Sequence, residues 1–195
     1  VRSTLKLHRF NNHTNIRHII VTIAAGVPSE TVRKFIDNAA PVIRLMPNTP
    51  AAVGKGTALI TYGDDICPED AEEFLSILKE SGTFEYVKES DFDITSSISG
   101  CSPAYAYMFI EAMADGAVSV GVPRDKAIRL AAGAVAGACE MILKTGKHPE
   151  QLKDEVCSPG GSTIAGVEAL EKNGFRYAAA QSIIKSTEKN CSLGK

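Results

Sequence analysis

Residues 19–46, IIVTIAAGVPSETVRKFIDNAAPVIRLM, read as a strand, a helix and a second strand, and this unit decides the fold class. The apolar runs Ile19–Ile23 and Val42–Met46 are typical of strands buried on both faces of a parallel sheet. Between them a helix begins near Ser29, whose side chain can cap it. Strands that alternate with helices predict an α/β sheet.

The alternation continues to about residue 90 and then stops. Further strands are expected at Thr57–Tyr62 and Phe84–Val87, with a helix at Pro68–Glu80 between them. Beyond residue 90 the patterns are helical, at Asp91–Ser99, Pro103–Val120, Asp125–Thr145, Thr163–Lys172 and Phe175 to about Asn190. We therefore expect two domains. Residues 1–90 would be the later strands of a partial Rossmann-like α/β domain, and residues 91–195 an all-α domain.

Composition excludes several classes of function. The chain has 195 residues, 44% of them hydrophobic and 23% charged, with a formal net charge of −2. It therefore lacks the basic surface that nucleic acid or an anionic membrane would need. The apolar stretch 127–143 carries Arg129 and Glu140 and is too short to span a bilayer. The five scattered cysteines form no CxxC pair, which favours reduced thiols in the cytoplasm and no metal site.

Small and polar residues follow the first two predicted strands. Ala24, Ala25 and Gly26 come after the first, and the loop Met46, Pro47, Asn48, Thr49 after the second. Carboxyl ends of parallel strands are where open α/β sheets bind nucleotides, although a tight turn and an ordinary loop are the alternatives. The chain contains no G-x-G-x-x-G fingerprint, since Gly54-Lys55-Gly56 supplies only G-x-G before a strand.

The segment SPGGST, residues 158–163, joins two helical patterns and is called the bridge below. Pro159 fixes its own φ, and the two glycines permit conformations that other residues avoid. Ser162 or Thr163 would cap the next helix, whose first N–H groups form a site for a small carboxylate. A plain capped turn is the alternative. The candidate substrate-binding residues are Ser158, Gly160, Gly161, Ser162 and Thr163.

Five ordered stretches resemble the pyrroline-5-carboxylate reductase family. They are VTIAAGVP, RLMPNTPAAVG, SISGCSPAYAYMFIEAMADG, GVPRDKAIRLA and TGKHPEQLKDEVCSPGGSTIAGVEALEKNGFR. The departures are small: Cys101-Ser102 stands where the family more often has Ser-Gly, and Ser162 where it has Thr or Ala. The resemblance implies an oxidoreductase that reduces 1-pyrroline-5-carboxylate to L-proline, the last step of proline biosynthesis, with NADPH or NADH.

The resemblance also assigns roles within this chain. Backbone N–H groups of Gly161, Ser162 and Thr163 would hold the carboxylate of the cyclic imine, and the Thr163 hydroxyl would reach the ring nitrogen as the catalytic group. The Ala24–Gly26 turn and the Met46–Thr49 loop would line the nicotinamide of the cofactor. No catalytic acid or base is required, because the protonated imine is already electrophilic and the cofactor carries the hydride.

The resemblance finally implies a homodimer with interlocked helical domains, possibly assembled into a ring of dimers. The family's N-terminal glycine fingerprint has no counterpart here, and the chain begins with Val1, so we expect an N-terminally truncated chain. The activity of residues 1–195 alone is accordingly open. The alternative is a non-catalytic chain that only dimerises and binds carboxylates.

Overall fold

The structure, a computed structural model, describes residues 18–37 and 40–193 and divides into two compact units. The first unit contains residues up to Pro103 together with those from Ile183 onward, and the second contains Ala104–Ser182. These units are sets of residues in mutual contact, and they do not test the boundary expected near residue 90 between an α/β and an all-α domain. That boundary stays a prediction. The start of the chain, on which the expected truncation depends, lies outside the described residues.

The first unit contains a four-stranded sheet in the order β1-β2-β3-β4. The strands are β1 (Ile20–Thr22), β2 (Val42–Met46), β3 (Gly56–Tyr62) and β4 (Gly82–Tyr86). The pairs β1·β2 and β3·β4 are parallel, whereas β2 and β3 are antiparallel. The sheet is therefore mixed. The link from β2 to β3 is too short for the helical crossover that a parallel pair needs.

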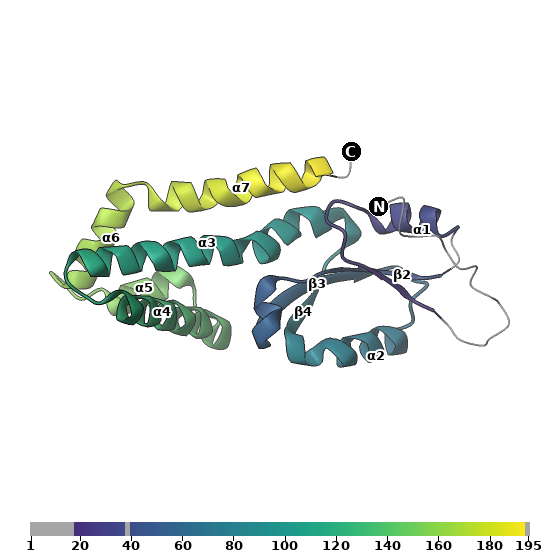
Figure 1. The fold of residues 1–195 in the computed structure, drawn as a ribbon, viewed down its shortest axis with the longest axis horizontal. Helices are drawn as coiled ribbons and strands as arrows, with labels where there is room; N and C mark the ends of the chain where they lie inside the picture. Colours follow the sequence, from purple (N-terminus) through teal and green to yellow (C-terminus); the bar gives the residue numbers. More distant parts are fainter. Residues whose placement is uncertain (1–17, 38–39, 194–195) are drawn as a thin grey trace. The chain divides into compact units, whose positions relative to one another are not determined.

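Strand β2 is buried on both faces, as its apolar run predicts. Side chains alternate along a strand, so Val42 and Ile43 enter different cores. Val42 packs with Ile36, whereas Ile43 lies in a second cluster with residues of β3 and α2. Helix α1 (Ser29–Phe35) and helix α2 (Pro68–Leu78) cover opposite faces of the sheet (Figure 1). This places β2 in the middle of the unit.

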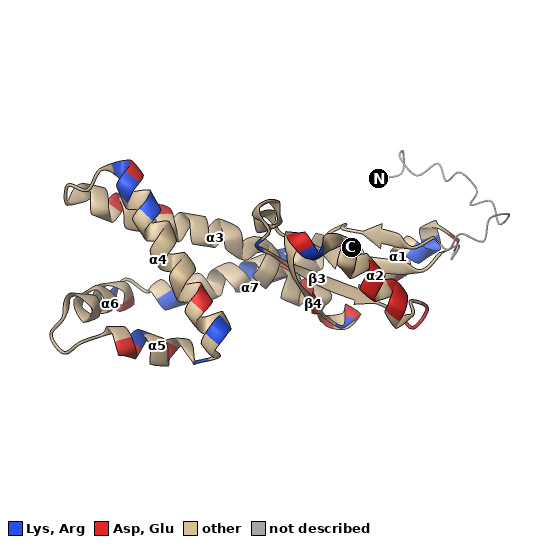
Figure 2. Ribbon diagram, turned by 90° about the horizontal axis from the view of Figure 1, so that it is seen from below, with Lys and Arg blue, Asp and Glu red and all other residues tan. Residues whose placement is uncertain are grey.

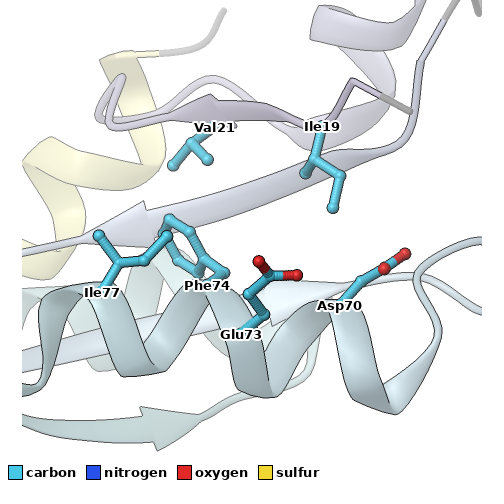
Figure 3. A pocket seen from close by; sticks show the side chains of 6 residues that line it. All are labelled: Ile19, Val21, Asp70, Glu73, Phe74 and Ile77. Atoms are coloured by element: carbon cyan, nitrogen blue, oxygen red, sulfur yellow. The ribbon is translucent and has the colours of Figure 1, made fainter. Parts of the chain in front are cut away.

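Strand β1 differs from its prediction. It pairs only with β2 among the described strands, and the Val21 side chain is 39% exposed. Ile19 and Val21 face Phe74 and Ile77 of α2 across an open pocket of about 230 Å³ (Figure 3). The expectation that this strand is buried on both faces is therefore wrong for the described residues, because β1 lies at the edge of the described sheet and Val21 faces the open pocket.

A buried arginine joins the sheet to the segment that follows it. Arg44, at 1% exposure on β2, pairs with Glu89 at 3.0 Å and with Asp93, and its guanidinium lies 4.2 Å from the ring centre of Phe92. Ser29 donates from its backbone N–H and its hydroxyl to the same Glu89 carboxylate, at 3.1 and 3.0 Å. Ser29 thus begins α1 but does not cap it, contrary to expectation, because its hydroxyl binds Glu89.

The later part of the chain is helical, as predicted. The helices are α3 (Phe92–Ser119), α4 (Arg124–Thr145), α5 (Pro149–Val156), α6 (Ser162–Lys172) and α7 (Phe175–Leu193), and short 3₁₀ turns are η1 (Thr49–Val53), η2 (Lys79–Ser81) and η3 (Glu89–Asp91). The two helices expected at 91–99 and 103–120 are a single helix, α3, with Pro103 inside it. That prediction is wrong because the helix continues through Pro103, and the Ser99 carbonyl that the proline leaves without a helix partner accepts from the Asn48 amide.

The second unit buries few side chains by itself. Its only buried residues are Ala114, Ala127 and Ala131, whereas Met108 is 69% exposed and Leu130 is 60% exposed. Figure 2 shows the charges of α4 gathered toward its two ends, with an uncharged middle. None of the helices within 18–37 and 40–193 has the length and apolar character needed to cross a membrane.

Candidate functional site

The two predicted cofactor segments leave neighbouring strands at one edge of the sheet. Strands β1 and β2 are parallel partners, so Ala24–Gly26 and Met46–Thr49 follow carboxyl ends that lie side by side. Ala24 and Ala25 are exposed, and the turn closes with a hydrogen bond from the Val27 N–H to the Ala24 carbonyl. Gly26 has φ +69°, a left-handed conformation that favours glycine.

The loop after β2 is held by its own asparagine. The Asn48 amide donates to the Ser99 carbonyl and accepts from the Thr57 N–H, both at 3.0 Å. Pro47 and Thr49, on either side, are exposed. The structure therefore leaves the Thr49 hydroxyl and the faces of Pro47 open, while much of the Asn48 side chain is engaged with the protein.

The bridge is a tight turn that needs both of its glycines. The Gly161 N–H donates to the Ser158 carbonyl at 3.0 Å. Gly160 has φ +67°, which side chains disfavour. A Cβ on Gly161 would lie 2.4 Å from the Ser158 hydroxyl oxygen and 3.1 Å from the Ser158 carbonyl oxygen. One glycine thus supplies the backbone conformation and the other supplies space.

Helix α6 begins at the bridge with Gly161 as its N-cap residue, and no side chain caps it. The prediction that Ser162 or Thr163 caps the helix is therefore wrong, because both lie inside its first turn. The Gly161 N–H is used within the turn, which leaves the N–H groups of Ser162 and Thr163 without a partner in the described chain. The Thr163 hydroxyl is exposed and likewise makes no hydrogen bond there.

A charge network braces the elements on both sides of the bridge. Arg176, at the start of α7, binds Glu150 of α5 at 2.7 Å and also Glu171 of α6, and Lys153 binds Glu150 at 2.8 Å. Hydrogen bonds from Lys153 and then Arg176 lower the pKa of Glu150 to about 2. Any stability from this ionised carboxylate is present above its ordinary pKa of 4.5 and is lost as pH falls through about 2.

The described residues offer little acid–base or metal chemistry. No cluster of three His, Cys, Asp or Glu side chains within 18–37 and 40–193 could hold a metal ion. All five cysteines are free thiols. The feature that stands out is the pair of open N–H groups at the start of α6, a kind of site at which helices bind anions.

Comparisons with known proteins now identify the family. A family model described as pyrroline-5-carboxylate reductase dimerisation matches residues 89–193. Pyrroline-5-carboxylate reductase from Escherichia coli K12 is 43% identical over 189 residues, covering 97% of this chain and 70% of that protein. This chain belongs to the pyrroline-5-carboxylate reductase family. The resemblance of the five ordered stretches is thereby confirmed.

Other members of the pyrroline-5-carboxylate reductase family agree. The enzyme from Methanosarcina acetivorans is 41% identical over 189 residues, which cover 97% of this chain and 70% of that protein. A solved pyrroline carboxylate reductase from Plasmodium falciparum, with NADP bound, matches at TM-score 0.84 and 32% identity over 91% of this chain and 71% of that one. The Streptococcus pyogenes enzyme matches at TM-score 0.84 and 30% identity, covering 91% and 69%. The predicted fold class is therefore confirmed.

The structure groups the predicted site residues of this pyrroline-5-carboxylate reductase chain in two places. Ala24–Gly26 and Met46–Thr49 belong to the first unit, and Ser158–Thr163 to the second. Sequence reasoning missed Arg44 and the pairing of Asn48 with Ser99. The sequence held a clue to the buried arginine, because VIRLM places Arg44 at an inward position of a strand that is otherwise apolar.

Proposed function

We propose that this chain reduces 1-pyrroline-5-carboxylate to L-proline with NADPH or NADH, the last step of proline biosynthesis. The observation that carries the proposal is the 43% identity to the Escherichia coli enzyme along nearly the whole chain. The open donors at the start of α6 suit the carboxylate of such a substrate. Nothing in the comparisons favours the alternative of a non-catalytic carboxylate-binding chain.

The substrate carboxylate binds at the start of α6. The N–H groups of Ser162 and Thr163 are free to donate, and the helix dipole adds a partial positive charge there. Ser158 and Gly160 shape the turn, and Gly161 contributes by having no side chain. This differs from the expected three donors, since the Gly161 N–H already binds Ser158.

Thr163 orients the imine. Its hydroxyl oxygen accepts a hydrogen bond from the N–H of the protonated ring nitrogen, and together with the contact to the carboxylate this fixes the orientation of the ring in the site. When bound, the nicotinamide cofactor supplies the hydride to that carbon. The nitrogen then keeps its proton and becomes the amine of proline, so no side chain has to donate or remove a proton.

The residues at the sheet edge fit the nicotinamide end of the cofactor. Ala24, Ala25 and Gly26 have no side chain beyond Cβ, so a flat ring can approach the backbone. Met46, Pro47 and the Thr49 hydroxyl line the neighbouring loop, which Asn48 holds in place. The small residues supply space, and the hydroxyl supplies a hydrogen-bonding group for the carboxamide.

The function is tested by incubating the purified chain with 1-pyrroline-5-carboxylate and NADPH or NADH, and measuring both cofactor oxidation and proline. The Escherichia coli relative serves as the positive control. Stoichiometric proline formation supports the proposal. Cofactor oxidation without proline, or no reaction under conditions in which the control is active, contradicts it for residues 1–195.

Changing Gly161 to valine is expected to raise KM for the imine about tenfold or more while the protein stays folded. A Cβ would collide with Ser158, so the turn must open and displace the Ser162 N–H. Steady-state kinetics and a thermal melt measure the two effects. Gly166→Ala is the matched control, since a Cβ there meets nothing within 4 Å. Outright unfolding of the valine variant would show that the bridge is structural.

The folded unit is a homodimer, which can assemble further into a ring of dimers. The second unit exposes large apolar side chains and buries only three alanines, so it needs a second surface to form a core. The small residues in the uncharged middle of α4, AAGAVAGA at residues 131–138, allow another helix to approach closely. The matched family model likewise describes dimerisation.

Light scattering at micromolar concentration is expected to give a dimer mass or a multiple of it. Leu130→Glu should weaken the association at least tenfold, because it would bury an unpaired carboxylate in the interface. Lys126→Glu, near the charged start of the same helix, is the control and should keep the wild-type mass. A stable, folded wild-type monomer contradicts the proposal.

We place the protein in the cytoplasm. Its five cysteines are all free in the structure, which suits a reducing compartment. Fractionation of expressing cells, with the chain detected by antibody, tests this location.

A further inference from the structure

Pro103 lies inside α3, where a proline leaves a carbonyl without its usual partner. In an α-helix the N–H of residue 103 would donate to the carbonyl of Ser99, four residues earlier. Proline has no N–H, and its ring crowds that carbonyl. Buried carbonyls normally find another donor. The donor here is the Asn48 side-chain amide, at 3.0 Å.

The same Asn48 amide group reaches a second backbone group. Its oxygen accepts the N–H of Thr57, on β3, at 3.0 Å. One planar amide therefore links β3 to α3 through one donor and one acceptor. Aspartate at position 48 could keep the contact with Thr57 but has no N–H for Ser99. Alanine would lose both contacts.

The linkage sits where it can fix the nicotinamide side of the site. Asn48 belongs to the loop Met46–Thr49, so the Ser99 carbonyl sets the position of that loop against α3. Arg44, four residues before Asn48, holds the first turn of α3 through Asp93. Within the first unit, α3 and the end of β2 are thus joined at two points, one ionic and one through the carbonyl that Pro103 frees.

We propose that Asn48 is a positioning residue for hydride transfer, acting through the Ser99 carbonyl and the Thr57 N–H and not through its own contact with the cofactor. The proposal rests on the proposed function. It also gives a shared role to Pro103, inside α3, and Asn48, in the loop after β2. Pro103 creates an open acceptor, and Asn48 uses it to anchor the loop.

A double-mutant cycle with Pro103→Ala tests the linkage itself. Alanine restores the N–H that pairs with Ser99 inside the helix, so the Asn48 donor becomes redundant there. Asn48→Ala is expected to lower Tm by about 3–8 °C in the wild type and by about half as much in the Pro103→Ala background, where only the contact with Thr57 is lost. Pro68→Ala, at the first turn of α2, is the control background, in which the full loss should persist.

Steady-state kinetics of the same variants distinguish a positioning role of Asn48 from direct binding of the cofactor. Asn48→Ala and Asn48→Asp should each lower kcat for proline formation at least tenfold, with both KM values within threefold of wild type. Pro103→Ala should not recover the kcat lost in Asn48→Ala, because the restored helix bond satisfies the Ser99 carbonyl but leaves the loop Met46–Thr49 without its anchor. A raised KM for NADPH with unchanged kcat, or equal Tm losses in both backgrounds, overturns the proposal. A wild-type chain that forms no proline overturns the proposed function instead, and the Tm cycle then decides the linkage alone.

Discussion

The double variant Glu89→Gln with Asp93→Asn is expected to lower the free energy of unfolding by about 3–5 kcal/mol. It removes both carboxylates from Arg44, which is 1% exposed and always protonated. The guanidinium would stay buried beside neutral amides and the ring of Phe92, with no opposite charge to compensate it. Urea unfolding followed by circular dichroism measures the change.

Arg44→Met is the variant to compare with this double variant. It removes the buried charge altogether, and the two carboxylates are 39% and 28% exposed and can be hydrated by water. We therefore expect it to cost less than the double variant. Glu188→Gln, which breaks the exposed pair with Lys185, should change stability by less than about 1 kcal/mol. An equal effect of all three would show that Arg44 is not held by its charge partners.

Thr163→Val is expected to lower kcat/KM for the imine about 10- to 100-fold. The change removes a hydrogen bond to a charged ring nitrogen, worth about 1.5–3 kcal/mol. Valine keeps the shape and the backbone N–H, so the carboxylate contact at the start of α6 survives. The loss should therefore fall mainly on kcat, measured by steady-state proline formation.

Two further variants control the result. Thr163→Ser keeps a hydroxyl and should retain most of the activity. Ser162→Ala, one residue earlier in the same turn of α6, keeps its N–H and should behave nearly as wild type. Activity of Thr163→Val within a factor of two of wild type would remove its hydroxyl from the site.

Local sequence patterns were enough to predict most of the elements, the fold class and the family, although α5 was not among the expected helices. Val42–Met46 was predicted with its observed bounds, because a central strand is apolar on both faces and its run is visible locally. The change from strands to helices near residue 90 was equally clear, since strand and helix periods differ. The bridge stood out through its proline and glycines, and its Gly160 has the left-handed backbone that such residues indicate.

Other features could have been inferred but were not. The short link between β2 and β3 excludes a parallel crossover, so the antiparallel pairing was readable from its length. The arginine within VIRLM was also visible, although not its partners. The catalytic and binding roles of the site residues stay predictions, with Gly161 now contributing space in place of a donor.

Which polar groups meet depends on contacts between distant parts of the chain. Asn48 and Ser99 are 51 residues apart, and Arg44 and Asp93 are 49 apart, so no local pattern links them. The continuity of α3 through Pro103, where a break was expected, was likewise not visible in the local sequence. Hydrophobic periodicity records which side of an element is buried, because burial repeats along the chain. A carbonyl without its helix partner, or a buried charge, needs a single donor or acceptor at the right place. That group can come from anywhere in the chain and reaches its place only when the chain has folded.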